Sequence, residues 1–123
     1  MVKRGEYLNM GNNIKDSEHQ REFLRVPYGT VVSISKDDQE YRDYPIEDLS
    51  GGGVSFFAPE SMFKEKDRIR GILYIEQKPV TFFAKIVRAA EHGHFAAEYV
   101  LIKESDRSKI IQAVLKEQLK YKK

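Results

Sequence analysis

The chain has 123 residues, 41% of them hydrophobic and 33% charged, which suits one compact domain and excludes two ordinary ones. It has no cysteine, which excludes disulfides and thiolate metal sites and favours a cytoplasmic location. We expect no membrane span and no signal peptide, and the net charge of +2 is too small for non-specific nucleic-acid binding.

Residues 1–18 are polar and show no periodicity, and we expect a flexible arm or linker there, ahead of one domain over 19–123. Alternating apolar and polar residues then predict six strands, followed by a different pattern after about residue 102. The predicted strands cover 29–36, 41–46, 53–58, 68–76, 80–88 and 95–102, with turns at 37–39, 77–79 and 92–94. Short strands at this spacing indicate a barrel or a sandwich.

The last segment has helical spacing. Ser105 is a favourable N-cap for a helix that we predict from about 105 to 120. One stripe of this helix should pack against the strands. Its members are Ile111, Val114, Leu115, Gln118 and Leu119.

Two short motifs stand out against this background. Arg21-Glu-Phe-Leu-Arg25 has the pattern RxxxR, and Asp48-Leu-Ser-Gly-Gly-Gly53 has the pattern DxSxxG. At this composition an RxxxR is expected by chance about 0.5 times and a DxSxxG about 0.03 times. The ordered pair is therefore informative, whereas either motif alone could be an ordinary charged segment or a plain turn.

The pair resembles the signature of the PilZ domain family, and the flagellar brake proteins look closest. The resemblance implies a mostly β fold, a six-stranded antiparallel β-barrel with a C-terminal α-helix, and a receptor for cyclic di-GMP. Implied ligand-binding residues are Arg21, Arg25, Asp48, Ser50 and Gly53, with Gln20, Gly52 and Arg88 as candidate additional contacts. Glutamine at position 20 leaves open whether one or two ligands bind.

The chemistry of these residues suits that ligand. Arginine binds phosphate oxygens through its planar fork, meets the O6 and N7 acceptors of guanine, and stacks on bases. An ionised Asp48 offers acceptors to the N1 and N2 donors on guanine's other edge. The Ser50 hydroxyl can donate and accept, and glycine at 53 allows a positive φ or a close backbone approach.

We find no catalytic motif, and we expect neither an enzyme nor a cofactor. His92 and His94 lack further ligands at metal-site spacing, so a polar turn is favoured over a metal site. Glu47 and Asp48 are adjacent, so on a regular strand they would point to opposite faces and form no acid–base pair.

The resemblance also implies a protein partner, such as a flagellar motor component, in control of motility or exopolysaccharide production. Two alternatives remain open. One is a small barrel that binds single-stranded nucleic acid, and the other is a protein-interaction module that binds no nucleotide.

Overall fold

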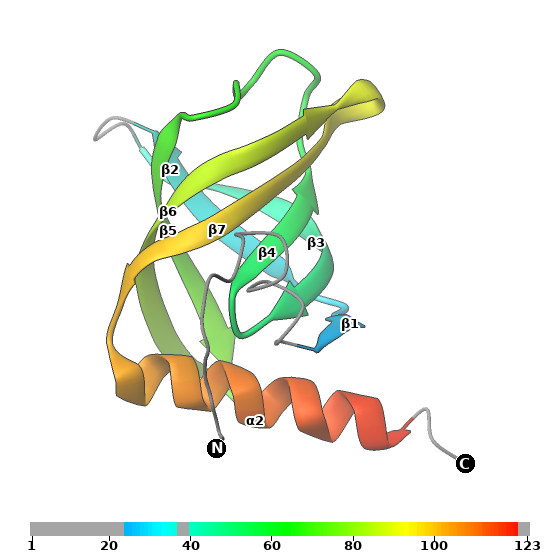
Figure 1. Ribbon diagram of the computed structural model, residues 1–123, viewed down its shortest axis with the longest axis vertical. Helices are drawn as coiled ribbons and strands as arrows, with labels where there is room; N and C mark the ends of the chain where they lie inside the picture. The colour runs from blue at the N-terminus through cyan, green and yellow to red at the C-terminus, as the bar shows by residue number, and fades with distance from the viewer. Residues whose placement is uncertain (1–23, 37–39, 121–123) are drawn as a thin grey trace, which may run out of the picture.

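Six strands close into an antiparallel barrel in the computed structural model, which describes residues 24–36 and 40–120 (Figure 1). The barrel strands are β2 (Val31–Lys36), β3 (Arg42–Ser50), β4 (Gly53–Phe57), β5 (Arg68–Ile75), β6 (Lys78–Ala90) and β7 (His94–Ile102). A short strand β1 (Arg25–Pro27), a 3-10 turn η1 (Glu91–Gly93) and the helix α2 (Glu104–Lys120) complete the described part.

The strand order is β3-β2-β5-β6-β7-β4, and pairing of β4 with β3 closes the ring. This confirms the six-stranded barrel with a C-terminal helix. β1 was not predicted, because three residues are too few to show a period. It pairs with the C-terminal end of β3, and β2 pairs with the N-terminal end. Between them, the Ile46 N–H donates to the Thr30 carbonyl at 3.0 Å.

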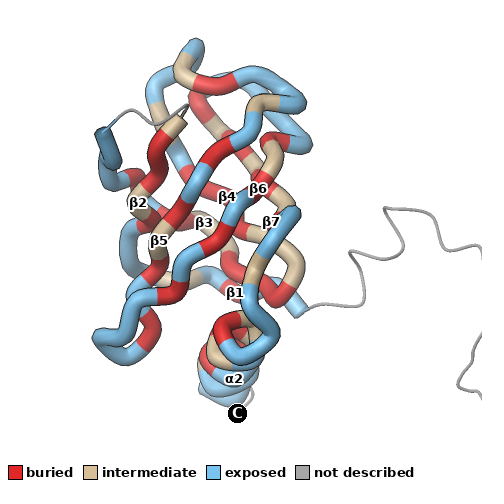
Figure 2. The backbone as a smooth tube through the Cα atoms, turned by 90° about the vertical axis from the view of Figure 1, so that its left-hand side faces the viewer, coloured by how far each residue is buried: buried red, intermediate tan, exposed pale blue. Residues whose placement is uncertain are grey.

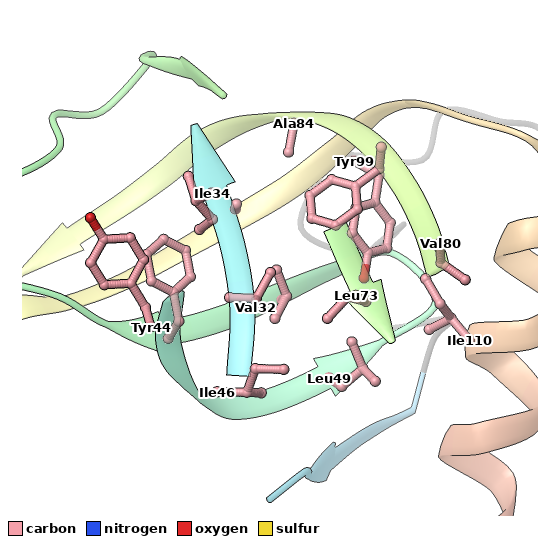
Figure 3. Packing of buried hydrophobic residues seen from close by; sticks show 14 of the residues in the cluster. Val32, Ile34, Tyr44, Ile46, Leu49, Leu73, Val80, Ala84, Tyr99 and Ile110 are labelled. Atoms are coloured by element: carbon pink, nitrogen blue, oxygen red, sulfur yellow. The ribbon is translucent and has the colours of Figure 1, made fainter. Parts of the chain in front are cut away.

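Alternation of burial, regular along β5 and most of β6, builds the core (Figure 2). Val32 and Ile34 of β2 point inward, as do Leu73 of β5 and Ala84 of β6 (Figure 3). The two phenylalanine pairs divide between the core and the surface. Phe56 and Phe82 are buried, and Phe57 and Phe83 are exposed.

The helix lies across one end of the barrel, where it contacts β1, β3 and β5 (Figure 1). Its buried residues are Asp106, Ile110, Ala113 and Val114, so the predicted stripe was wrong except at Val114. Leu115 and Leu119 are 47% and 67% exposed. The barrel covers only one face of the helix, from its N-terminal end to its middle. Among the helices of the described ranges, none is long and apolar enough to cross a membrane.

Ser105 is not the helix cap. The Arg107 N–H donates to the Lys103 carbonyl at 2.9 Å, which makes Lys103 the N-cap residue and puts Ser105 inside the first turn. Acidic side chains at Glu104 and Asp106 in that turn favour helix initiation through the helix dipole.

Several strand boundaries also differ from the prediction. β3 runs four residues beyond 46, because its C-terminal part pairs with both β1 and β4. The turn between β5 and β6 consists of Glu76 and Gln77, both with positive φ, and β6 begins at Lys78. Two such residues match the twist of a hairpin, although neither is the usual asparagine or glycine. The predicted turn at 37–39 lies outside the described residues.

Candidate ligand-binding site

A β-bulge in β3 places two consecutive acidic residues on the outer side of the barrel. The register pairs Asp48 with Ser55 of β4 and skips Glu47, the extra residue of the bulge. Ile46 and Leu49 are both in the core, so Glu47 and Asp48 lie between them, half-buried. The expectation that they point to opposite faces was therefore wrong. Asp48 lines a groove, and Glu47 bonds instead to Ser55 and His94.

Ser50 organises the turn between β3 and β4. Its Oγ accepts the N–H groups of Gly52 and Gly53, each at 3.1 Å, and donates to the Gly53 carbonyl at 3.3 Å. The side chain is buried, and these three bonds use its hydrogen-bonding capacity. Ser50 thus shapes the backbone of the groove, a role that local turn chemistry favours for serine.

Gly53 allows two backbones to meet. A Cβ at this position would lie 2.2 Å from the carbonyl oxygen of Ala97 on β7. Glycine is therefore required at position 53 because another backbone approaches closely, which is one of the two reasons that the sequence suggested. The approaching backbone is that of β7. This contact brings β4 and β7 together at the floor of the groove.

Arg25 reaches the groove from β1, where it lies opposite Ser50 in register and is exposed to solvent. The pairing of β1 with β3 thus joins the second arginine of RxxxR to the DxSxxG motif. Arg21 and Gln20 lie outside the described residues, as does the predicted arm over 1–18.

A second bulge, in β6, orients Arg88. The register pairs Ile86 with Ala97 and Arg88 with Ala96, which leaves Val87 as the extra residue. Ile86 is buried, and unbroken alternation would turn Arg88 inward. The bulge instead turns it outward, so that Arg88 and Lys85 both line the groove.

The groove has a volume of about 420 Å³ and crosses β1, β3, β4, β7 and β6. Its charged lining residues are Arg25, Asp48, Lys85, Arg88 and Glu98. Three cations and two carboxylates suit a ligand that carries both phosphates and hydrogen-bond donors. Among the described residues that line the groove, none is aromatic.

A buried tyrosine and a half-buried arginine hydrogen-bond to the glycine turn. The Tyr99 hydroxyl donates to the Ser50 carbonyl at 3.3 Å, and Arg107 Nη1 donates to the Gly51 carbonyl at 2.7 Å. Burial raises the pKa of the Tyr99 phenol well above its ordinary value. A neutral phenol and an α2 arginine therefore hold the motif turn against the end of the barrel.

Sequence reasoning missed Lys85, Ser55 and Glu98 as groove residues. Outward alternation along β6 marked Lys85 as a surface residue, but its neighbours depend on register across the sheet. Lys85 pairs with Glu98, and Glu98 pairs with Gly53. Within 24–36 and 40–120, no three histidines or acidic residues are grouped to hold a metal ion.

A sequence model of the PilZ domain matches residues 19–116. The chain belongs to the PilZ domain family. PilZ domains form a c-di-GMP receptor family and are typically non-catalytic binding modules. No curated protein matches this PilZ chain by sequence.

Solved structures agree with the PilZ fold. MotI/DgrA, the Bacillus subtilis inhibitor of motility, matches with a TM-score of 0.73 at 17% identity, over 84% of this chain and 53% of that one. This chain therefore spans about half the length of that protein. The PilZ domain with c-di-GMP of Escherichia coli YcgR matches with a TM-score of 0.63 at 12% identity, over 83% of this chain and 94% of that one.

The PilZ domain of CeSA from a cellulose-synthesizing bacterium matches with a TM-score of 0.61 at 18% identity, over 77% of this chain and 98% of that one. At such low identities these likenesses concern the fold, and the site must be argued from its own residues.

Proposed function

We propose that this PilZ domain is a non-catalytic receptor that binds cyclic di-GMP in the groove and signals to a protein partner. The observation that carries the proposal is the meeting of Arg25 and Asp48, one from each motif, on a single groove with Lys85 and Arg88. Cations on two sides of a carboxylate match a dianionic ligand whose guanines carry N–H donors.

Each polar side chain has a role in this proposal. Arg25, together with Arg21, binds a phosphate or the O6 and N7 atoms of a guanine, and Asp48 accepts from the N1 and N2 donors. Lys85 and Arg88 attract the second phosphate from β6. Ser50, Gly52 and Gly53 contribute the backbone of the turn rather than side-chain contacts.

Binding would hold the segment that carries Arg21 against the barrel, next to Arg25 on β1, and so create a surface for a protein partner. The free energy available for signalling is limited to the ligand's preference for the bound arrangement. Resemblance in fold to an inhibitor of motility and to a PilZ domain from a cellulose-synthesizing bacterium supports an output in motility or exopolysaccharide control.

A non-specific binder of single-stranded nucleic acid is less well supported. Such proteins stack bases on aromatic side chains along a basic channel. The described lining of this groove contains no aromatic ring and includes the carboxylates of Asp48 and Glu98. Those carboxylates would repel a polyanion that offered no matching donors.

The test is a calorimetric titration with cyclic di-GMP. We expect saturable binding by the wild type, and a loss of about tenfold or more in Arg25→Ala and Asp48→Ala, since each removes a charge-assisted hydrogen bond. Arg42→Ala, on the exposed N-terminal end of β3 and away from the groove, should bind like the wild type. A folded wild type that gives no binding heat and no competition with a labelled ligand would refute the proposal.

A further inference from the structure

A chain of hydrogen bonds leads from the groove to a half-buried histidine outside it. The Asp48 N–H donates to Ser55 Oγ at 3.1 Å, and Ser55 Oγ lies 3.3 Å from Glu47 Oε1. His94 Nε2 bonds to the same carboxylate oxygen. This series of hydrogen bonds crosses β3, β4 and β7. Of its four residues, Asp48 and Ser55 line the groove, whereas Glu47 and His94 do not.

The direction of each bond follows from the chemistry of Glu47. An ionised carboxylate can only accept, so the Ser55 hydroxyl and the His94 ring nitrogen must both donate to it. With its proton committed to Glu47, the Ser55 oxygen offers a lone pair to the Asp48 N–H. The proton on His94 Nε2 is fixed in the same way.

Ring stacking and partial burial restrict this arrangement. The His94 ring stacks on Phe57, its cross-strand neighbour, with ring centroids 5.1 Å apart and planes 22° apart. The side chains of His94 and Glu47 are 26% and 37% exposed, and Ser55 is buried. Partial burial strengthens hydrogen bonds and limits the positions these groups can take.

Asp48 needs such support because it follows the bulge. The extra residue Glu47 interrupts the regular β3–β4 register, and the side chain of Ser55 supplies an acceptor for the Asp48 N–H. The bulge also turns Asp48 outward. The bond to Ser55 thus anchors the backbone that carries the Asp48 carboxylate.

We propose that Ser55, Glu47 and His94 are positioning residues that set the Asp48 carboxylate for guanine and so determine base selectivity. This inference rests on the proposed function. Guanine presents N1–H and N2–H donors together, whereas adenine has no proton on N1 and no amino group at C2. A correctly placed carboxylate distinguishes the two bases, and a displaced one loses that distinction while phosphate binding by the cations continues.

The measured quantity is the ratio of the dissociation constants for cyclic di-AMP and cyclic di-GMP. Ser55→Thr keeps the hydroxyl and Ser55→Val removes it at nearly the same volume. We expect Ser55→Val to lower the ratio about tenfold through weaker cyclic di-GMP binding, and Ser55→Thr to keep it close to the wild-type value. In an Asp48→Ala background, Ser55→Val should leave the ratio unchanged, because the positioned group is already gone.

If Ser55 had only a structural role, Ser55→Val would weaken the binding of both ligands by the same factor. The ratio of the two dissociation constants would then stay unchanged. If both Ser55 variants fail to fold, Glu47→Ala takes their place. Its matched control is Glu91→Ala, whose side chain is 92% exposed. A ratio that stays at the wild-type value in folded Ser55→Val, or in Glu47→Ala, overturns the inference and leaves the proposed function standing. A wild type that does not bind cyclic di-GMP refutes the proposed function itself.

Discussion

At the scale of single residues, the DxSxxG motif divides into one residue whose side chain faces the groove and two residues that shape the backbone around it. Asp48 lines the groove beside a bulge. The Ser50 hydroxyl is hydrogen-bonded to the backbone of its own turn, and the missing Cβ of Gly53 leaves room for β7. The motif therefore marks a backbone shape as much as a set of ligand contacts. Loss of Ser50 or Gly53 should act on binding through the fold.

Gly53→Ala should destabilise the domain. The added Cβ would lie 2.2 Å from the Ala97 carbonyl oxygen, so β4 and β7 must separate. We expect the free energy of unfolding to fall by about 2 kcal/mol or more, as overpacking does elsewhere. Urea denaturation measures this. At Gly29 an added Cβ meets nothing within 4 Å. Gly29→Ala should therefore unfold at a urea midpoint close to that of the wild type. Equal midpoints for the two variants would contradict the account.

Arg88→Ala should weaken cyclic di-GMP binding without loss of stability. Arg88 is exposed and lines the groove, so its contribution is electrostatic. We expect a drop in affinity of about tenfold, the order of one charge-assisted hydrogen bond. Lys78→Ala, at the exposed start of the same strand and outside the groove lining, is the matched control. Equal affinities in the two variants would remove Arg88 from the site.

At the scale of elements, α2 is attached by one short face. Ile110 is fully buried in the barrel core, and Leu119 on the same helix is 67% exposed. Ile110→Ala should cost about 2–5 kcal/mol in unfolding free energy, whereas Leu119→Ala should change it by less than about 0.5 kcal/mol. Thermal or urea unfolding of the pair tests this. A larger cost at Leu119 would restore the stripe that helical spacing predicted.

The strands were readable from the sequence wherever alternation was regular. Val32 and Ile34 marked β2, and similar runs marked β5 and β6. The bulges at Glu47 and Val87 were not readable, because one extra residue changes the register without changing the composition. The helix face also could not be read, since several apolar residues compete for burial and the barrel covers one side.

The candidate site was readable to a similar extent. The two motifs identified Asp48 and Arg25, because their spacing along the chain is a local property. Lys85, Glu98 and Ser55 join the groove only through pairing between β4, β6 and β7. Such pairing joins Glu98 to Lys85, 13 positions away, and to Gly53, 45 positions away, and no local pattern encodes it.

At the scale of the whole molecule, two tyrosines make the stability of the fold depend on pH in the alkaline range. Burial raises the pKa of Tyr99, and burial followed by Glu117 and Glu76 raises the pKa of Tyr28. In the unfolded chain both phenols ionise near pH 10, whereas in the folded barrel they stay neutral to higher pH. Their contribution to stability is thus present below about pH 10 and is lost as the pH rises further.

We therefore expect the urea midpoint to decrease between about pH 9 and 11, and to decrease less steeply in Tyr99→Phe. The comparison of slopes is the measurement, because Tyr99→Phe also removes the bond to the Ser50 carbonyl and lowers the midpoint at every pH. Parallel slopes for the two proteins would show that the Tyr99 phenol does not control the alkaline transition.

The central claim is that the ligand occupies the groove where the two motifs meet. The most direct measurement is a titration of the isotope-labelled domain with cyclic di-GMP, followed by amide chemical shifts. We predict that the largest changes fall at Arg25, Asp48, Gly53, Lys85 and Glu98, with little change at Tyr74 on β5, which lies outside the groove lining. Saturating shifts confined to β5 or to the C-terminal half of α2, with the groove amides unmoved, would contradict the account.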